Sequence, residues 1–175
     1  AKIVADDDAA GDLFGSAVAI DGDYAIVGAM YDDTPDKAGS AYIFIRSGTS
    51  WSQQAKIRHQ SKGTDDYFGS AVDIDGDYVI VGAYREDENN NDYGSAYIFV
   101  RSGTSWSEQA KLRANDKNRL DFLGYSVSIS GDYAVVGAYG DDDGGTDSGS
   151  AYFFARSGTS WSQQAKIVAD DDAAG

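Results

Sequence analysis

The chain has 175 residues, of which 42% are hydrophobic and 25% charged, so it can bury a core as one domain or as a few repeated units. Its 29 acidic and 14 basic side chains give a net charge of −15, which disfavours nucleic acid and anionic membrane surfaces as partners. The absence of cysteine and the single histidine exclude a disulfide scaffold, a thiolate zinc site and a histidine-rich metal site. No apolar run reaches the roughly 18 residues of a membrane helix, so we expect no membrane insertion.

The first third of the chain predicts four short strands joined by turns. They are expected at residues 15–20, 24–29, 39–47 and 51–58. The first uses small residues, and the second and third are apolar on both faces, as in a sheet covered on both sides. The fourth alternates apolar and polar residues, which suits a partly solvated outer strand. No stretch has a sustained helical period, so we expect very little helix.

This pattern then repeats with a period of about 55 residues. The hexapeptide RSGTSW occurs at 46–51, 101–106 and 156–161. We therefore interpret residues 1–175 as one repeat domain with units 1–54, 55–109 and 110–164, and each unit carries the same strand signals. Residues 165–175 read AKIVADDDAAG and are identical to residues 1–11.

Small residues at the centre, apolar strands in the middle and a polar outer strand are typical of a propeller blade. The sequence thus predicts an all-β fold of β-propeller type, with three four-stranded antiparallel blades in series. Three face-packed sheets, about 10 Å apart, cannot close a ring. We expect closure only by oligomerisation, for example two chains in a six-bladed ring, or by further repeats in a longer chain. The core is expected to include Val27, Ile43, Phe44 and Ile57, with counterparts Val81, Ile98, Phe99 and Leu112.

A recurring motif carries a family resemblance. Phe14-Gly15 is followed by Val27-Gly28-Ala29, and the pattern returns as Phe68-Gly69 with Val81-Gly82-Ala83 and as Leu123-Gly124 with Val136-Gly137-Ala138. All three units resemble FG-GAP repeats, which build the propellers of integrin alpha chains and of many bacterial extracellular proteins. Met30, Tyr84 and Tyr139 stand where the family has proline. The resemblance implies a β-propeller, an extracellular or cell-surface location, and adhesion or ligand binding.

Calcium is the one cofactor that the sequence suggests. Integrin-type blades often bind it between their first two strands, but here Asp21–Asp23 and its counterparts are bare hairpin turns. The remaining candidate is the loop with Asp141, Asp143 and Asp147, which contains two glycines; hard cations prefer several oxygens on such loops. The aligned residues of the second unit are Glu86, Glu88 and Asp92. The alternative is a solvated acidic loop that aids solubility.

Other recurring residues favour structural roles. An aspartate precedes each FG motif, and we expect it to bind loop amides; the three are Asp12, Asp66 and Asp121. The repeated Trp51, Trp106 and Trp161, with Tyr24, Tyr78 and Tyr133, are interpreted as blade packing, with a sugar-binding platform as the alternative. His59 is assigned to a variable polar loop, and no nucleophile motif lies near it.

The leading functional hypothesis is a non-enzymatic extracellular module for adhesion, assembly or structural scaffolding. The first alternative is a propeller that binds a carbohydrate or another small ligand, and the second is an aspartate-based enzyme. Expected partners are further copies of the chain, as a homo-oligomer or a longer repeat array, and a glycan or protein ligand. No catalytic residue is assigned.

Overall fold

The computed structural model describes residues 2–32, 36–60, 63–87, 91–146 and 148–169. Within these ranges the chain forms twelve strands and no helix. The strands are β1 Phe14–Asp21, β2 Tyr24–Ala29, β3 Ser40–Ser47, β4 Ser50–Ile57, β5 Ala71–Asp75, β6 Tyr78–Ala83, β7 Ser95–Ser102, β8 Ser105–Leu112, β9 Leu123–Ser130, β10 Tyr133–Ala138, β11 Ser150–Ser157 and β12 Ser160–Ile167.

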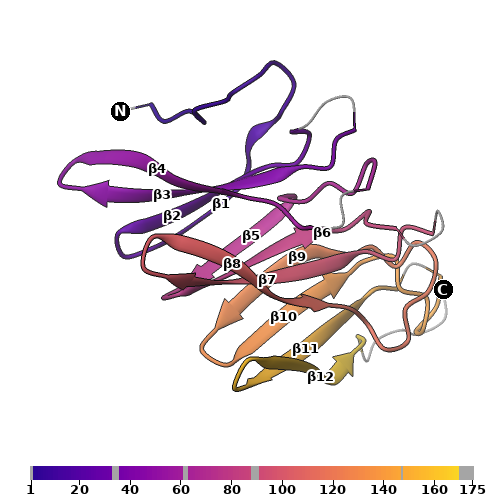
Figure 1. Ribbon diagram of the computed structural model, residues 1–175. Helices are drawn as coiled ribbons and strands as arrows, with labels where there is room; N and C mark the ends of the chain where they lie inside the picture. Colours follow the sequence, from indigo (N-terminus) through magenta and orange to yellow (C-terminus); the bar gives the residue numbers. More distant parts are fainter. Residues whose placement is uncertain (1, 33–35, 61–62, 88–90, 147, 170–175) are drawn as a thin grey trace.

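The strands form three antiparallel sheets, each a simple meander of four consecutive strands. The sheets follow one another as layers of a stack, from β1–β4 through β5–β8 to β9–β12 (Figure 1). They do not close into a ring, so the arrangement is an open series of propeller-like blades. The predicted fold class is confirmed, and the predicted strands of the first unit agree with β1–β4 to within a residue or two.

Strand order within each blade follows the sequence pattern. β1, β5 and β9 contact one another in series, so the strands with the small residues form the inner edge of the stack. β4, β8 and β12 are the outer strands, where exposed and half-buried residues alternate in the first half of each strand. The two-residue turn between β1 and β2 is held by the Asp23 carbonyl, which accepts the Arg46 N–H at 2.8 Å.

The apolar core lies between the blades. Ile26 and Ile43 of the first blade pack against Val72, Val81 and Phe99 of the second. An equivalent layer joins the second and third blades, with Ile80, Ile98 and Leu112 against Val136 and Phe154. Each blade therefore buries both faces only when it has a neighbour on both sides.

Glycines of the repeated motif allow the blades to approach at the backbone. A Cβ placed on Gly28 would lie 1.9 Å from the carbonyl oxygen of Gly69 in the next blade, and one on Gly82 would lie 2.0 Å from that of Gly124. No side chain fits at these distances. The glycine of the FG pair in one blade thus meets the glycine after the valine of the preceding blade, which explains why the two glycines recur together.

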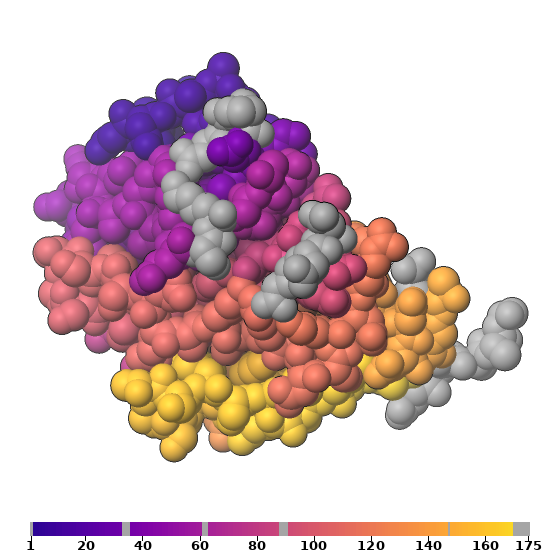
Figure 2. Space-filling view, turned by 45° about the vertical axis from the view of Figure 1, so that its right-hand side comes forward, coloured from indigo at the N-terminus to yellow at the C-terminus, as the bar shows by residue number. Residues whose placement is uncertain are grey.

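One core assignment needs correction at the open end of the stack. Ile43, Phe44 and Ile57 are buried as predicted, and so are their counterparts Ile98, Phe99 and Leu112. Val27, however, is half-buried, whereas its counterpart Val81 is fully buried. Val81 faces the first blade, but no blade lies in front of Val27. Figure 2 shows the layers in sequence order, with the N-terminal segment lying on the first blade.

Candidate functional site

The same polar cluster occurs in every blade, and we call it the carboxylate–tyrosine–lysine set. An acidic residue follows the second strand, a tyrosine lies on the third strand and a lysine on the fourth. The three sets are Asp32, Tyr42 and Lys56; Glu86, Tyr97 and Lys111; and Asp141, Tyr152 and Lys166. All three acidic residues are buried, and in each set the tyrosine hydroxyl and the lysine ammonium bind the carboxylate.

The third set contains one of the predicted calcium ligands, Asp141, and its lysine also reaches a second, Asp143. Asp141 Oδ2 accepts hydrogen bonds from the Tyr152 hydroxyl at 2.7 Å and from Lys166 Nζ at 2.8 Å, and Ser150 Oγ donates to Oδ1 at 2.9 Å. Lys166 also pairs with Asp143. Burial alone would raise the pKa of Asp141, but these hydrogen bonds together lower it. Burial likewise opposes the charge on Lys166, and its bonds to Asp141 and Asp143 raise the pKa of that ammonium.

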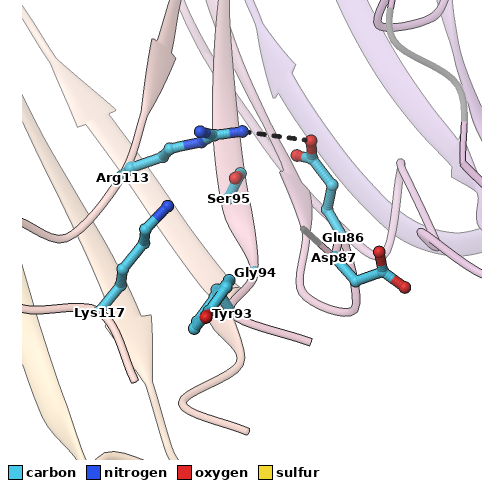
Figure 3. Close-up of a pocket in the computed structure, with 7 residues that line it drawn as sticks. All are labelled: Glu86, Asp87, Tyr93, Gly94, Ser95, Arg113 and Lys117. Carbon is cyan, nitrogen blue, oxygen red and sulfur yellow. Dashed lines mark ion pairs between the residues drawn. The ribbon is translucent and has the colours of Figure 1, made fainter. Parts of the chain in front are cut away.

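Figure 3 shows the surroundings of Glu86, the acidic residue of the second set, where Glu86 and Arg113 point toward each other. The Glu86 carboxylate accepts the Tyr97 hydroxyl at 2.6 Å, pairs with Lys111, and lies 3.8 Å from Arg113 Nη2. The space between Glu86, Arg113, Tyr93 and Lys117 has no room for a water molecule. Lys111 and Arg113 thus offset the charge of Glu86, and the Tyr97 hydroxyl donates a hydrogen bond to it.

Calcium binding stays a prediction. Glu88 and Asp147 lie outside the described residues. Glu86 and Asp92 bind different cations, because Asp92 Oδ2 pairs with Arg85 at 3.0 Å. Across the described ranges no three His, Asp or Glu side chains are grouped as a metal site would need. A calcium ion held by Asp141 and Asp143 would have to displace the ammonium of Lys166.

The aspartates before the FG motifs have the predicted amide-binding role. Each accepts the backbone N–H of the residue three positions earlier: Asp12 from Ala9, Asp66 from Gly63 and Asp121 from Asn118. All three are buried. Burial raises the pKa of Asp121 to about 6, because the protein interior disfavours the charged form.

His59 lies in the loop after β4, as predicted, but its surroundings are not those of a polar loop. Its side chain is fully buried and packs against the rings of both Phe68 and Tyr97, with centroids 5.3 and 5.0 Å away. Nδ1 lies 3.3 Å from the Tyr97 hydroxyl, and Nε2 lies 3.2 Å from Asp66 Oδ2 without hydrogen-bond geometry. The repeat alignment could have indicated the burial of His59, because the equivalent residues are the apolar Ala5 and Ala114. Both are buried.

The repeated tryptophans connect neighbouring blades. Trp106 Nε1 donates to Gln54 Oε1 of the preceding blade at 3.0 Å, and Trp161 donates to Gln109 at 2.9 Å. Arg101 likewise donates to the Tyr24 hydroxyl at 2.7 Å and lies over its ring. These contacts agree with the packing interpretation.

Sequence reasoning missed a row of aromatic side chains at one end of the inner strands. Neighbouring rings contact one another from the first blade to the third, at centroid distances of 4.5 to 6.0 Å. The row consists of Tyr31, Tyr67, Tyr84, Phe122, Tyr125 and Tyr139. Beside it lies a cleft of about 370 Å³ lined by Ser16, Met30, Ser70, Tyr84 and Tyr125. The sequence did contain a sign of this row and cleft. Met30, Tyr84 and Tyr139 are the residues that replace the proline of the motif.

The comparison with family models agrees with this architecture. A model described as FG-GAP repeat matches residues 1–44, 51–99 and 106–154, one match for each blade. The chain belongs to the FG-GAP repeat family. No curated protein matches it. In the described part of this FG-GAP chain, no helix has the length and apolarity needed to cross a membrane. The two glycines of the family motif are those that meet between blades.

Proposed function

We propose that this FG-GAP chain is a non-enzymatic module for adhesion, assembly or structural scaffolding outside the cell or at its surface. One observation carries the proposal: apolar residues that are buried between blades inside the stack are uncovered at its two ends. Val18 and Ile20 are 68% and 67% exposed, whereas their counterparts Val72 and Ile74 are 9% and 5% exposed. Large uncovered apolar surfaces are typical of protein interaction sites.

The chemistry of the buried polar groups supports a structural role over a catalytic one. In each blade the acidic residue of the carboxylate–tyrosine–lysine set pairs with the lysine and accepts a hydrogen bond from the tyrosine. Asp66, His59 and Tyr97 lie in a row, an arrangement that proton-transfer sites also use. The His59 and Asp66 side chains, however, are only 0% and 2% exposed, so a substrate does not reach them. A catalytic base has to reach its substrate within hydrogen-bond distance.

A second candidate function rests on the cleft beside the aromatic row. Ligand sites are commonly concave and combine aromatic walls with a few hydroxyl groups. Tyr84 and Tyr125 provide ring surface, and Ser16 and Ser70 provide hydroxyls. This combination suits a carbohydrate, whose ring has an apolar face and polar edges, or another small ligand of the same character.

A glycan array in millimolar calcium, read together with a panel of hydrolase substrates, tests these alternatives. We expect neither a sugar-specific signal nor turnover. Tyr125→Ser is the matched variant for the cleft, because Ser16 and Ser70 occupy this position in the other blades. A sugar signal that this variant removes would replace the proposal with the ligand-binding function. Turnover that Asp66→Asn removes would establish an enzyme instead.

A further inference from the structure

The two ends of the stack present opposite halves of one interface. We call the first the front face, formed by Phe14, Val18, Ile20 and Val27 of the first blade. The rear face is formed by Val135, Ala151, Phe153 and Ile167 of the third blade. The counterparts of the front residues pack against the preceding blade, and those of the rear residues pack against the following blade. Ile167, for example, is 53% exposed, whereas its counterparts Ile57 and Leu112 are 5% and 2% exposed.

The backbone at the two ends has the same complementarity. Inside the stack, a Cβ on Gly69 or Gly124 would lie 2.2 Å from a serine carbonyl of the preceding blade, but one on Gly15 meets no atom within 4 Å. A Cβ on Gly82 would clash with the backbone of the next blade, whereas the nearest atom to one on Gly137 is the side-chain hydroxyl of Ser126 in its own blade. Gly15 and Gly137 are thus the two unmatched halves of the contact between glycines.

The donors and acceptors of the hydrogen bonds between blades are also divided between the two ends. Trp51 occupies the position from which Trp106 and Trp161 donate to a glutamine of the preceding blade, and Gln164 occupies the acceptor position. Similarly, Arg46 corresponds to Arg101, which donates to the hydroxyl of Tyr24. Tyr133, the counterpart of Tyr24, is 60% exposed on the third blade.

The N-terminal segment already occupies part of the front face. Ile3 and Ala5 pack there beside Phe44, as Leu112 and Ala114 pack on the third blade. The Asp6 N–H donates to Gln53 at 3.0 Å, and the equivalent Asn115 N–H donates to Gln163 at 2.9 Å. The segment therefore lies where the end of a preceding blade would lie. Residues 165–175, which begin within the last strand of the third blade, have the same sequence as residues 1–11.

We infer that the front face binds the rear face of a second copy of this chain, head to tail, and that residues 166–169 of one copy replace the identical residues 2–5 of the other. The exchange substitutes the same side chains into the same contacts, as in domain swapping. A head-to-tail interface either closes into a ring or continues as an open chain. The inference rests on the proposed assembly function and names its partner.

The experiment measures the mass of the 175-residue chain in solution by light scattering at high micromolar concentration. We expect at least twice the monomer mass of 18.6 kDa. Because the net charge of −15 opposes self-association, added salt should increase the assembled fraction. A chain that stays at 18.6 kDa with and without added salt overturns the inference.

Two variants and their mixture identify the faces. The front variant carries Val18→Asp and Ile20→Asp, and the rear variant carries Gly137→Ala and Ile167→Asp. Each alone should be monomeric, whereas the mixture should form one-to-one pairs, because each retains the face that the other lacks. Ser102→Asp, at an exposed hairpin of the middle blade, is the control and should assemble as the wild type does.

Circular dichroism and melting curves confirm that each variant is folded before its mass is interpreted. A front variant that still self-associates, or a mixture that contains only monomers, overturns the head-to-tail arrangement. These outcomes leave the glycan and turnover results unaffected. The failure of this inference can therefore be distinguished from the failure of the proposed function.

Discussion

Replacing Gly28 with alanine tests the contact between the motif glycines. The new Cβ would lie 1.9 Å from the carbonyl oxygen of Gly69 and 2.9 Å from its carbon, and both atoms belong to the backbone. Real Cβ atoms keep at least about 3 Å from such neighbours, so the first two blades would have to separate by roughly 1 Å along this edge. Gly28 has no positive φ, so the cost comes from the contact between blades and not from backbone strain.

The expected loss of unfolding free energy follows from two opposing effects. Overpacking a close contact costs about 1–3 kcal/mol and more where rigid backbone must move. Alanine also restricts the unfolded chain, which returns about 0.4–1 kcal/mol. Because backbone must move here, the overpacking cost should reach at least the upper end of its range, and we expect Gly28→Ala to destabilise the chain by about 2 kcal/mol or more.

Gly137→Ala is the matched control, since it changes the same motif position in the third blade. There the new Cβ meets only the hydroxyl of Ser126 among neighbours closer than 3.4 Å, and that side chain can rotate. We expect a change within about 1 kcal/mol of the wild type. Urea unfolding followed by tryptophan fluorescence measures both variants, at a concentration where the chain is monomeric. Two variants that differ by less than about 1 kcal/mol would refute the contact.

Three further predictions concern single side chains. Phe44→Ala should cost about 3–5 kcal/mol in urea unfolding, because this ring is buried against Phe14; a loss below about 1 kcal/mol would show that the strand facing is wrong. Burial raises the pKa of Asp121 to about 6, above its ordinary value of 3.8, so folding favours its neutral form. The stabilisation from protonated Asp121 is complete below pH 3.8 and is lost as the pH rises through 6. Compared with Asp121→Asn, the wild type should therefore gain about 1–2 kcal/mol on acidification from neutral pH, and identical pH profiles would contradict the assignment. Calcium should raise the melting temperature by less than about 3 °C, and Asp143→Ala should remove that rise; equal melting temperatures with calcium and with chelator in both proteins would remove the metal prediction.

The sequence by itself determined the repeat, the strands and the order of the blades. Strand alternation, turn glycines and the 55-residue period are properties of neighbouring residues, so they can be read without knowing what packs where. The amide-binding role of Asp12, Asp66 and Asp121 was predictable for the same reason, because each contact spans three residues.

Only the tertiary structure decided which side chains meet. Lys166 reaches Asp141 from 25 positions away, and His59 lies against Tyr97 from 38 positions away. Such contacts depend on which strand lies beside which loop, and the repeat pattern does not contain that information. Val27 shows the same limit from the other side: its residue type matches Val81, but its burial depends on whether another blade covers it. Apolar character gives a residue a tendency to be buried, and only a neighbouring surface removes it from water.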